Sequence, residues 1–268
     1  MAVMEGKPAS YYKEQGRQEI PIRLSLTETR NGSNEVRGLR VPGTTKDLRW
    51  GQTPWIIDFR PEPVPLPQSL DFAVIGGGFT GLSAAATLRR LNPEKTVAVF
   101  EADTIGARSS GHTGGLALGE TAAGDLPGLG DVLAGLSEII KGLNVTCNLS
   151  LPGAWELNRT TETRYSLIQW TDSGSLRVAR EVPGGTVDPG KLVSGLARAA
   201  VERGALLLEG APVDDIDFGD PLTLQVRGQQ VRAQRVLIAT NSESLELSNL
   251  AERAEPKLTL AQIGRAHV

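Results

Sequence analysis

The chain has 268 residues, of which 40% are hydrophobic and 22% charged, an ordinary composition for a soluble globular protein of one or two domains. A net charge of -3 provides no basic field for nucleic acid, and no apolar run approaches the ~20 residues of a transmembrane helix. The single cysteine, Cys147, excludes an internal disulfide. The N-terminus lacks the apolar core of a signal peptide, so we expect a cytoplasmic protein.

Residues 1–70 form a polar leader whose second half is stiffened by Pro54, Pro61, Pro63, Pro65 and Pro67. The part from 50 to 67 also holds tryptophans and isoleucines, which makes it too apolar for a pure spacer. We expect 50–67 to lie across the folded body and 1–45 to be looser.

A dinucleotide-binding pattern occupies residues 71–101. An apolar strand at 71–75 leads into Gly76-Gly77-Gly78-Phe79-Thr80-Gly81, which fits GxGxxG and opens a helical segment at 82–91. A second strand at 96–100 ends in Glu101. Strand, glycine turn, helix, strand and carboxylate follow in the order that a dinucleotide site needs, although a glycine-rich turn in an ordinary α/β protein remains an alternative.

Each residue type in this pattern has a physical role. Gly76 permits the tight turn, Gly78 lets a pyrophosphate approach the backbone, and Gly81 lets the helix pack closely on the sheet. The start of the helix offers N–H groups and a partial positive charge to the phosphates. Glu101 is placed to accept both ribose hydroxyls and would repel the 2′-phosphate of NADP, but this stretch does not separate NAD from FAD.

A second glycine-rich loop follows the acid. Ala102 begins it, and its core is Ser109-Ser110-Gly111-His112-Thr113-Gly114-Gly115, which is dense in hydroxyls and hydrogen-bond donors. We predict that this loop lies beside the middle of a long cofactor and binds its pyrophosphate and ribityl chain.

These residues resemble the FAD-dependent D-amino acid oxidase and glycine oxidase superfamily, and within it the bacterial oxidoreductases related to gamma-glutamylputrescine oxidase. Those proteins have a proline-containing leader, the same glycine turn with Phe-Thr, and a Ser-Gly-x-x-Gly-Gly loop that residues 109–115 match. The resemblance implies an α/β fold: a Rossmann-like FAD-binding domain with a parallel sheet, plus the beginning of an inserted antiparallel-sheet substrate domain.

His112-Thr113 stands where many relatives have Arg-Asn. In the related sarcosine and dimethylglycine dehydrogenases a histidine similar to His112 bonds covalently to the flavin. We expect non-covalent FAD with His112 as a donor to the flavin edge, and a covalent link through His112 is the alternative.

The following residues alternate between helical and strand-like patterns. Apolar residues at helical spacing predict a core-facing helix near 129–143, and 151–187 turns strand-like, with strands near 154–157 and 167–170 and a turn at 183–185. The resemblance assigns 71–150 to the first part of the FAD-binding domain and 151–187 to the start of the substrate domain.

Residues 188–245 are assigned to the second part of the FAD-binding domain. Asp188 is predicted to cap a helix over 190–203, and the apolar strand at 205–208 is typical of a buried parallel sheet. Strands near 213–218, 222–227 and 230–232 indicate an antiparallel meander. The resemblance places Val213 against the adenine, with plain strand packing as an equal alternative.

The strand at 235–239 runs into Ala239-Thr240-Asn241 and resembles the second short flavoprotein motif, which favours FAD over NAD. Together the patterns and the resemblance predict these cofactor contacts: Gly76, Gly78, Phe79, Thr80, Gly81, Glu101, Ala102, Ser109, Ser110, His112, Thr113, Gly114, Gly115, Val213, Ala239 and Thr240.

The C-terminal part predicts a truncated chain. The family's sheet takes a further strand from beyond residue 240, and nothing here supplies it. Residues 263–268, Ile-Gly-Arg-Ala-His-Val, match what a common sequencing adapter encodes in one frame. We expect 246–268 to be a truncated segment with an artefactual end, and most of the substrate pocket to be missing.

The sequence therefore favours a flavoenzyme that oxidises a C–N bond of a small amine or amino acid by hydride transfer to FAD. It indicates no catalytic side chain and no metal site, and it leaves the substrate, the electron acceptor and the oligomeric state open. A non-catalytic FAD-binding fragment is the alternative. An NAD-linked dehydrogenase is a further one, but it leaves 109–115 and 235–241 unexplained.

Overall fold

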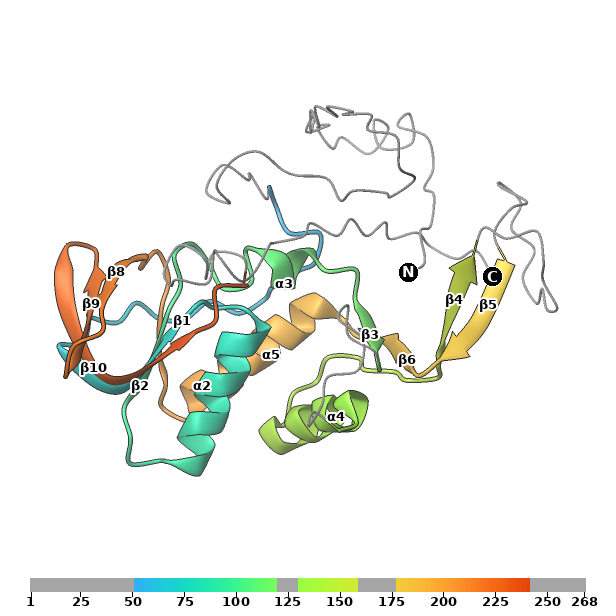
Figure 1. Cartoon of the computed structure of the whole chain (residues 1–268), viewed down its shortest axis with the longest axis horizontal. Helices are drawn as coiled ribbons and strands as arrows, with labels where there is room; N and C mark the ends of the chain where they lie inside the picture. Colours follow the sequence, from blue (N-terminus) through green and yellow to red (C-terminus); the bar gives the residue numbers. More distant parts are fainter. Residues whose placement is uncertain (1–50, 120–129, 159–176, 242–268) are drawn as a thin grey trace, which may run out of the picture.

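The computed structural model describes residues 51–119, 130–158 and 177–241 (Figure 1). The expectations for 1–45, for a strand near 167–170 and for 246–268 lie outside these residues. In the part described, no helix is long and apolar enough to cross a membrane.

A six-stranded sheet with the order β7-β2-β1-β10-β9-β8 forms one side of the molecule (Figure 1). Its parallel part consists of β1 (Ser69–Ile75), β2 (Val97–Phe100), β7 (Leu206–Leu208) and the second half of β10 (Gln229–Ile238). The register sets Ala73 opposite Ala98 on one side and Val236 on the other. The four predicted parallel strands are therefore confirmed.

The antiparallel meander is also present, with one difference. β8 (Val213–Asp217) pairs with β9 (Leu222–Val226), and β9 pairs with the first half of β10. The sequence predicted separate strands at 230–232 and 235–239, but β10 is continuous from 229 to 238. The two predicted strands merge because the pairing with β1 continues from Arg232 and Ala233 to Ile238.

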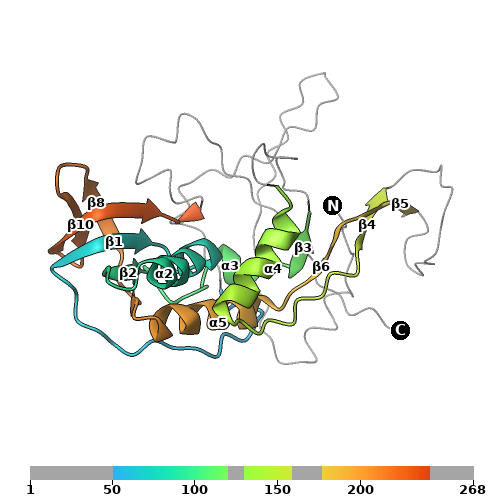
Figure 2. The same cartoon turned by 90° about the horizontal axis from the view of Figure 1, so that it is seen from below.

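Two helices cover one face of the sheet, α2 (Phe79–Leu91) and α5 (Pro189–Glu202), and they lie against each other (Figure 2). Leu82 and Ala86 of α2 pack with Val193 and Ala197 of α5 over Val74 in one buried cluster. Fully burying a side chain such as Val193 stabilises the fold by about 1.5–3 kcal/mol. As predicted, Asp188 caps α5: its carboxylate accepts from the Lys191 amide at 3.0 Å.

The opposite face has its own core. Ala73 and Phe100, which alternate with the residues facing the helices, pack there against Leu224 and Val231 of the meander. The strands β1, β2 and β7 are thus largely buried on both faces, which explains their continuous apolar sequences, whereas Arg235 and Leu237 of β10 are exposed.

The predicted helix is present as α4 (Val132–Leu143), and its apolar stripe is only partly buried. Leu143 is its one fully buried side chain, while Ile139 is 43% exposed. At its last turn Ile140 and Leu143 join the core cluster, and at its first turn Leu133 lies near Gly119.

Two small antiparallel pairs follow the main sheet. β3 (Leu116–Leu118) pairs with β6 (Gly184–Thr186), and β4 (Ala154–Asn158) pairs with β5 (Arg177–Val182). The turn predicted at 183–185 is wrong, because 184–186 form β6. Its glycines allow a close approach: a Cβ on Gly185 would lie 1.9 Å from the carbonyl oxygen of Ser150.

The segment from 51 to 67 lies along the folded body, as its apolar content predicts (Figure 2). Ile57 and Phe59 pack on the helix-side core, and Val64 and Leu66 on the opposite core. The chain therefore passes from one face of the sheet to the other before β1 begins.

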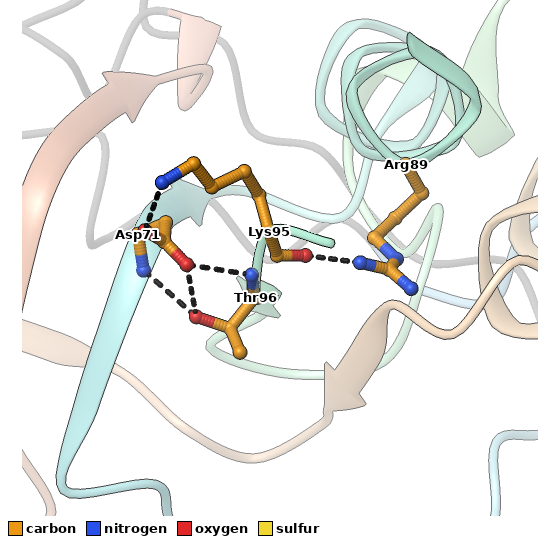
Figure 3. Close-up of polar contacts among 4 residues, drawn as sticks. All are labelled: Asp71, Arg89, Lys95 and Thr96. Atoms are coloured by element: carbon orange, nitrogen blue, oxygen red, sulfur yellow. Dashed lines mark hydrogen bonds and ion pairs between the residues drawn. The ribbon is translucent and has the colours of Figure 1, made fainter. Parts of the chain in front are cut away.

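Polar contacts fix the sheet at the start of β1 (Figure 3). Asp71 accepts from the amide and hydroxyl of Thr96 at 2.8 and 2.9 Å and pairs with Lys95 at 3.1 Å. Arg89 of α2 donates to the carbonyl oxygens of Lys95 and Arg203. The loop between α2 and β2 is thereby tied to β1 and to the end of α5.

Candidate cofactor site

The candidate site lies where β1, β2 and β10 end. These strands are parallel neighbours, so their carboxyl ends meet at one edge of the sheet. Ligands of open α/β sheets bind at such an edge. The residues that follow the three strands are 76–78, 101–108 and 239–241.

The turn from β1 into α2 has the shape that the glycine pattern predicts. Gly76 has a φ of +107°, and a Cβ there would lie 2.5 Å from the carbonyl oxygen of Ala239. A Cβ on Gly81 would lie 1.9 Å from the carbonyl oxygen of Gly76. The predicted turn and packing roles of Gly76 and Gly81 are confirmed.

Glu101 is buried at the end of β2, with 8% of its surface exposed. Its carboxylate accepts hydrogen bonds from the amides of Gly77 at 2.7 Å and Asp103 at 2.9 Å. Burial raises the pKa of Glu101, and the two amides and the nearby charge of Arg108 act against that rise. The position is thus a buried acid held by backbone donors.

A one-turn helix, α3 (Ser109–His112), lies against the start of α2. The sequence predicted a loop here, and its first half is helical instead. The hydroxyl of Ser110 accepts from the amide of Phe79 at 3.0 Å, next to the N-cap residue Gly78, which has no side chain to do so. A Cβ on Gly78 would lie 2.7 Å from that hydroxyl oxygen.

The end of β10 contacts α3 from the other side. Asn241 has a φ of +52°, a left-handed conformation that asparagine tolerates better than most residues. Its side-chain amide donates to the hydroxyl of Ser109 at 2.8 Å. Ser109 and Ser110 therefore connect α3 to β10 and to α2 respectively.

The loop after β2 is also fixed by its backbone. The amide of Gly106 donates to the carbonyl oxygen of Gly77 at 3.0 Å, and that of Gly210 donates to Asp103 at 2.7 Å. Ile105 donates its amide to the Glu209 carboxylate at 2.8 Å. The loops after β1, β2 and β7 thus form one connected backbone arrangement.

His112 and Thr113 lie at the end of α3 and are half-buried. The His112 Nδ1 atom lies 2.9 Å from the carbonyl oxygen of Arg108, which can only accept, so Nδ1 donates this hydrogen bond. The carbonyl oxygen of Thr113 accepts from the indole N–H of Trp55 at 2.8 Å.

These contacts bring together at one sheet edge the predicted residues Gly76, Gly78, Phe79, Glu101, Ser109, Ser110 and Ala239. Val213 stands apart at the start of β8, partly buried on the meander core, and Ala102 is exposed. The sequence reasoning missed Gly77, Trp55 and Asn241. The run of three glycines was a signal for Gly77, because a Cβ there would lie 3.0 Å from the Glu101 side chain. Nothing local marked Trp55, since its contact is 58 residues away along the chain.

These residues fit an adenine dinucleotide. The Glu101 carboxylate has about four lone-pair positions, and the Gly77 and Asp103 amides use two of them, leaving two for hydroxyl donors. The first turn of α2 offers amides beside glycines, where phosphates bind in other proteins. In the described ranges no cluster of histidine, cysteine or acidic residues could hold a metal ion.

A family model described as DAO, FAD dependent oxidoreductase, matches residues 71–183 and 157–266. The chain belongs to this family. A search of curated proteins found no match.

Solved structures agree with this family in fold. Glycine oxidase from Bacillus cereus ATCC 14579 is 20% identical in sequence. The match covers 68% of this chain and 58% of the oxidase chain, with a TM-score of 0.51. L-amino acid deaminase from Proteus vulgaris, with its specific insertion deleted, is 14% identical over 79% and 61% of the two chains, with a TM-score of 0.53. The L-amino acid deaminase from Proteus myxofaciens, in complex with anthranilate, is 15% identical over 74% of this chain and 51% of its own, with a TM-score of 0.50. This chain spans little more than half the length of these proteins.

Proposed function

We propose that this chain binds FAD non-covalently at the shared edge of β1, β2 and β10. The observation that carries the proposal is the buried Glu101 carboxylate, held by the Gly77 amide next to the open N-terminus of α2. A family of FAD-dependent oxidoreductases supports FAD over NAD as the dinucleotide.

In this proposal Glu101 accepts the two ribose hydroxyls of the adenosine half. The pyrophosphate would lie over Gly78 and the first turn of α2, where the amides of Thr80 and Gly81 precede the first intrahelical bond, from Leu82 to Gly78. Ser110 assists, because a hydroxyl that accepts from the Phe79 amide can still donate its own proton to a phosphate oxygen. Ala102 lies beside Glu101, and Val213 would contact the adenine.

The other predicted contacts belong to the flavin half. Ser109, His112, Thr113, Gly114 and Gly115 would border the ribityl chain and ring, with Ala239 and Thr240 passing close to the cofactor from β10. The close approach of Gly76 to the Ala239 carbonyl brings this strand end to the turn after β1. His112 would act as a hydrogen-bond partner at the flavin edge.

We further propose that the whole protein oxidises a C–N bond of an amine or amino acid. Glycine oxidase and L-amino acid deaminase, which share the fold, act on such compounds by their names. Bound FAD would supply the acceptor for the hydride that leaves the substrate carbon. The residues described here bind and orient that acceptor, and none of them is positioned as an obvious acid or base for the substrate.

The test is a visible spectrum of the purified chain reconstituted with FAD, followed by anaerobic addition of amines and amino acids. Amine-dependent bleaching of bound flavin supports the oxidoreductase. Bound flavin that no amine bleaches supports the alternative of an FAD-binding fragment without catalysis. A colourless chain that binds NAD would contradict both.

The covalent alternative has its own test. Because Nδ1 of His112 bonds the Arg108 carbonyl oxygen, a covalent link would involve Nε2. Acid precipitation of the loaded protein is expected to release all of its yellow colour. Colour that stays with the precipitate in the wild type but not in His112→Ala would show a covalent bond.

A further inference from the structure

An extended segment lies behind the loop that we propose to border the flavin. We propose that residues 53–59, the backing strap, set the geometry of residues 106–115, the cofactor loop, and that Trp55 is a positioning residue for it. What the loop binds rests on the proposed function; the mechanical relation between strap and loop does not.

The backing strap has two distinct sides. Trp55 and Ile57 are half-buried, as are the first and last residues of the strap, while the residues between them are exposed. Ile56, the most exposed large hydrophobic residue described, has 85% of its surface accessible. This alternation is that of an extended chain with one side on the protein. The sequence alone does not show it, because Ile56 and Ile57 are equally apolar.

The inward side chains meet glycines of the cofactor loop. A Cβ added to Gly111 would lie 2.7 Å from Thr53 Cγ2, and one added to Gly106 would lie 2.9 Å from Ile57 Cδ1. On Gly115 it would lie 3.4 Å from Trp55 Cζ2. At Gly106 and Gly111 the loop can lie this close to the strap because these positions have no side chain, and at Gly115 the contact with Trp55 is an ordinary van der Waals one.

The backing strap is itself fixed to α5. The Asp58 amide donates to the hydroxyl of Ser194 at 3.0 Å, and Ser194 is 2% exposed. The guanidinium of Arg198 lies 5.7 Å from the centre of the Phe59 ring. Since α5 belongs to the core, these contacts give the strap a rigid base that does not depend on the loop.

Trp55 joins that base to one peptide group of the loop. Its indole N–H donates to the Thr113 carbonyl oxygen at 2.8 Å. In a trans peptide the C=O and the following N–H point in opposite directions. Holding the Thr113 carbonyl against Trp55 therefore directs the Gly114 N–H away from the strap. Trp55 sets the direction of this donor without contacting the cofactor.

The test uses the full chain with Trp55→Phe, which keeps an aromatic ring and removes the N–H. Ile56→Ala, in the same strap but exposed, is the matched control. Two quantities are measured: the Kd for FAD, and hydrogen exchange of the flavin-free protein along the chain. Losing one hydrogen bond of about 1 kcal/mol should raise the Kd about fivefold. Exchange should increase within 106–116 and stay unchanged in β1, β2 and α5.

The outcomes separate this inference from the proposed function. Unchanged exchange in 106–116, or an increase spread evenly over sheet and helices, would overturn it, as would an unchanged Kd. If the wild type binds no FAD, the proposed function fails. The hydrogen-exchange pattern alone then decides whether the strap sets the geometry of the cofactor loop. If Trp55→Phe does not fold, Thr53→Ser, which removes the methyl group against Gly111, must raise exchange in the same residues, or the inference fails.

Discussion

The Gly77 amide donates a hydrogen bond of 2.7 Å to the carboxylate of Glu101, and this joins the turn after β1 to the end of β2. The Glu101 carboxylate is thereby held beside the N-terminus of α2 and does not point into solvent. A ribose and a pyrophosphate are neighbours in a dinucleotide, so the two protein groups that would bind them are already held at one place.

Glu101→Ala should weaken FAD binding by about 1–3 kcal/mol, because the ribose hydroxyls lose their acceptor on binding. Titration of the flavin-free protein with FAD measures the change. Asp103→Ala is the matched control, since Asp103 contributes its amide and that variant keeps it. Equal affinity in the wild type and Glu101→Ala would remove Glu101 from the site.

The free energy of unfolding of the flavin-free protein should also depend on Glu101 through pH. Burial raises the pKa of Glu101 above its ordinary value of about 4.3. Its contribution to stability is therefore fully present below that value and is lost as the pH rises through the raised pKa. The stability of the wild type relative to Glu101→Gln should fall with rising pH, as urea unfolding at a series of pH values would show. A relative stability that increases with pH would contradict the direction of the shift.

Two glycine-to-alanine changes in helices should have opposite effects. In Gly81→Ala the new Cβ would lie 1.9 Å from a backbone oxygen, so the loss of stability should reach or exceed the ~1–3 kcal/mol typical of overpacking. In Gly135→Ala, in α4, the Cβ meets nothing within 4 Å, and stability should increase by about 0.5–1 kcal/mol. Thermal or urea unfolding of both variants decides. A tolerated Gly81→Ala would contradict the packing of α2 on β1.

Asp71 should stabilise the protein in a pH-dependent manner. Its contacts with Thr96 and Lys95 lower its pKa to about 2 (Figure 3). A lowered pKa gives stability that is present above the unfolded value of about 3.9 and is lost as the pH falls toward 2. Asp71→Asn should therefore have a lower Tm than the wild type at neutral pH, and the two should converge in acid.

Thr96→Val tests the same contact from the other side, because it removes the hydroxyl and keeps the backbone amide. Its difference from the wild type should also shrink as the pH falls. A Tm difference for Asp71→Asn that is constant from neutral pH to acid would show that the ionised carboxylate contributes nothing.

The nucleotide-binding half of the fold was predictable because its signals are local. The apolar strand before Gly76, the glycine turn and the acid at Glu101 follow within one short stretch, and each has a single structural role. The same holds for the helix that starts at Asp188, where cap and proline stand together.

The remaining errors came from contacts distant in sequence. Gly184 and Gly185 suggested a turn, but they form a strand because glycines allow the chain near Ser150 to approach. The same holds for the contact of Trp55 with Thr113 and for the exposure of Ile139. Both depend on which residues the tertiary fold places beside them, and no local sequence pattern predicts those neighbours.

The most direct test of the central claim is an equilibrium titration of the purified flavin-free chain with FAD and, separately, with NAD. The account predicts saturable binding of FAD, with the bound flavin remaining on the protein through gel filtration, and much weaker binding of NAD. A chain that is folded yet retains no flavin, or that binds NAD in preference, would contradict it.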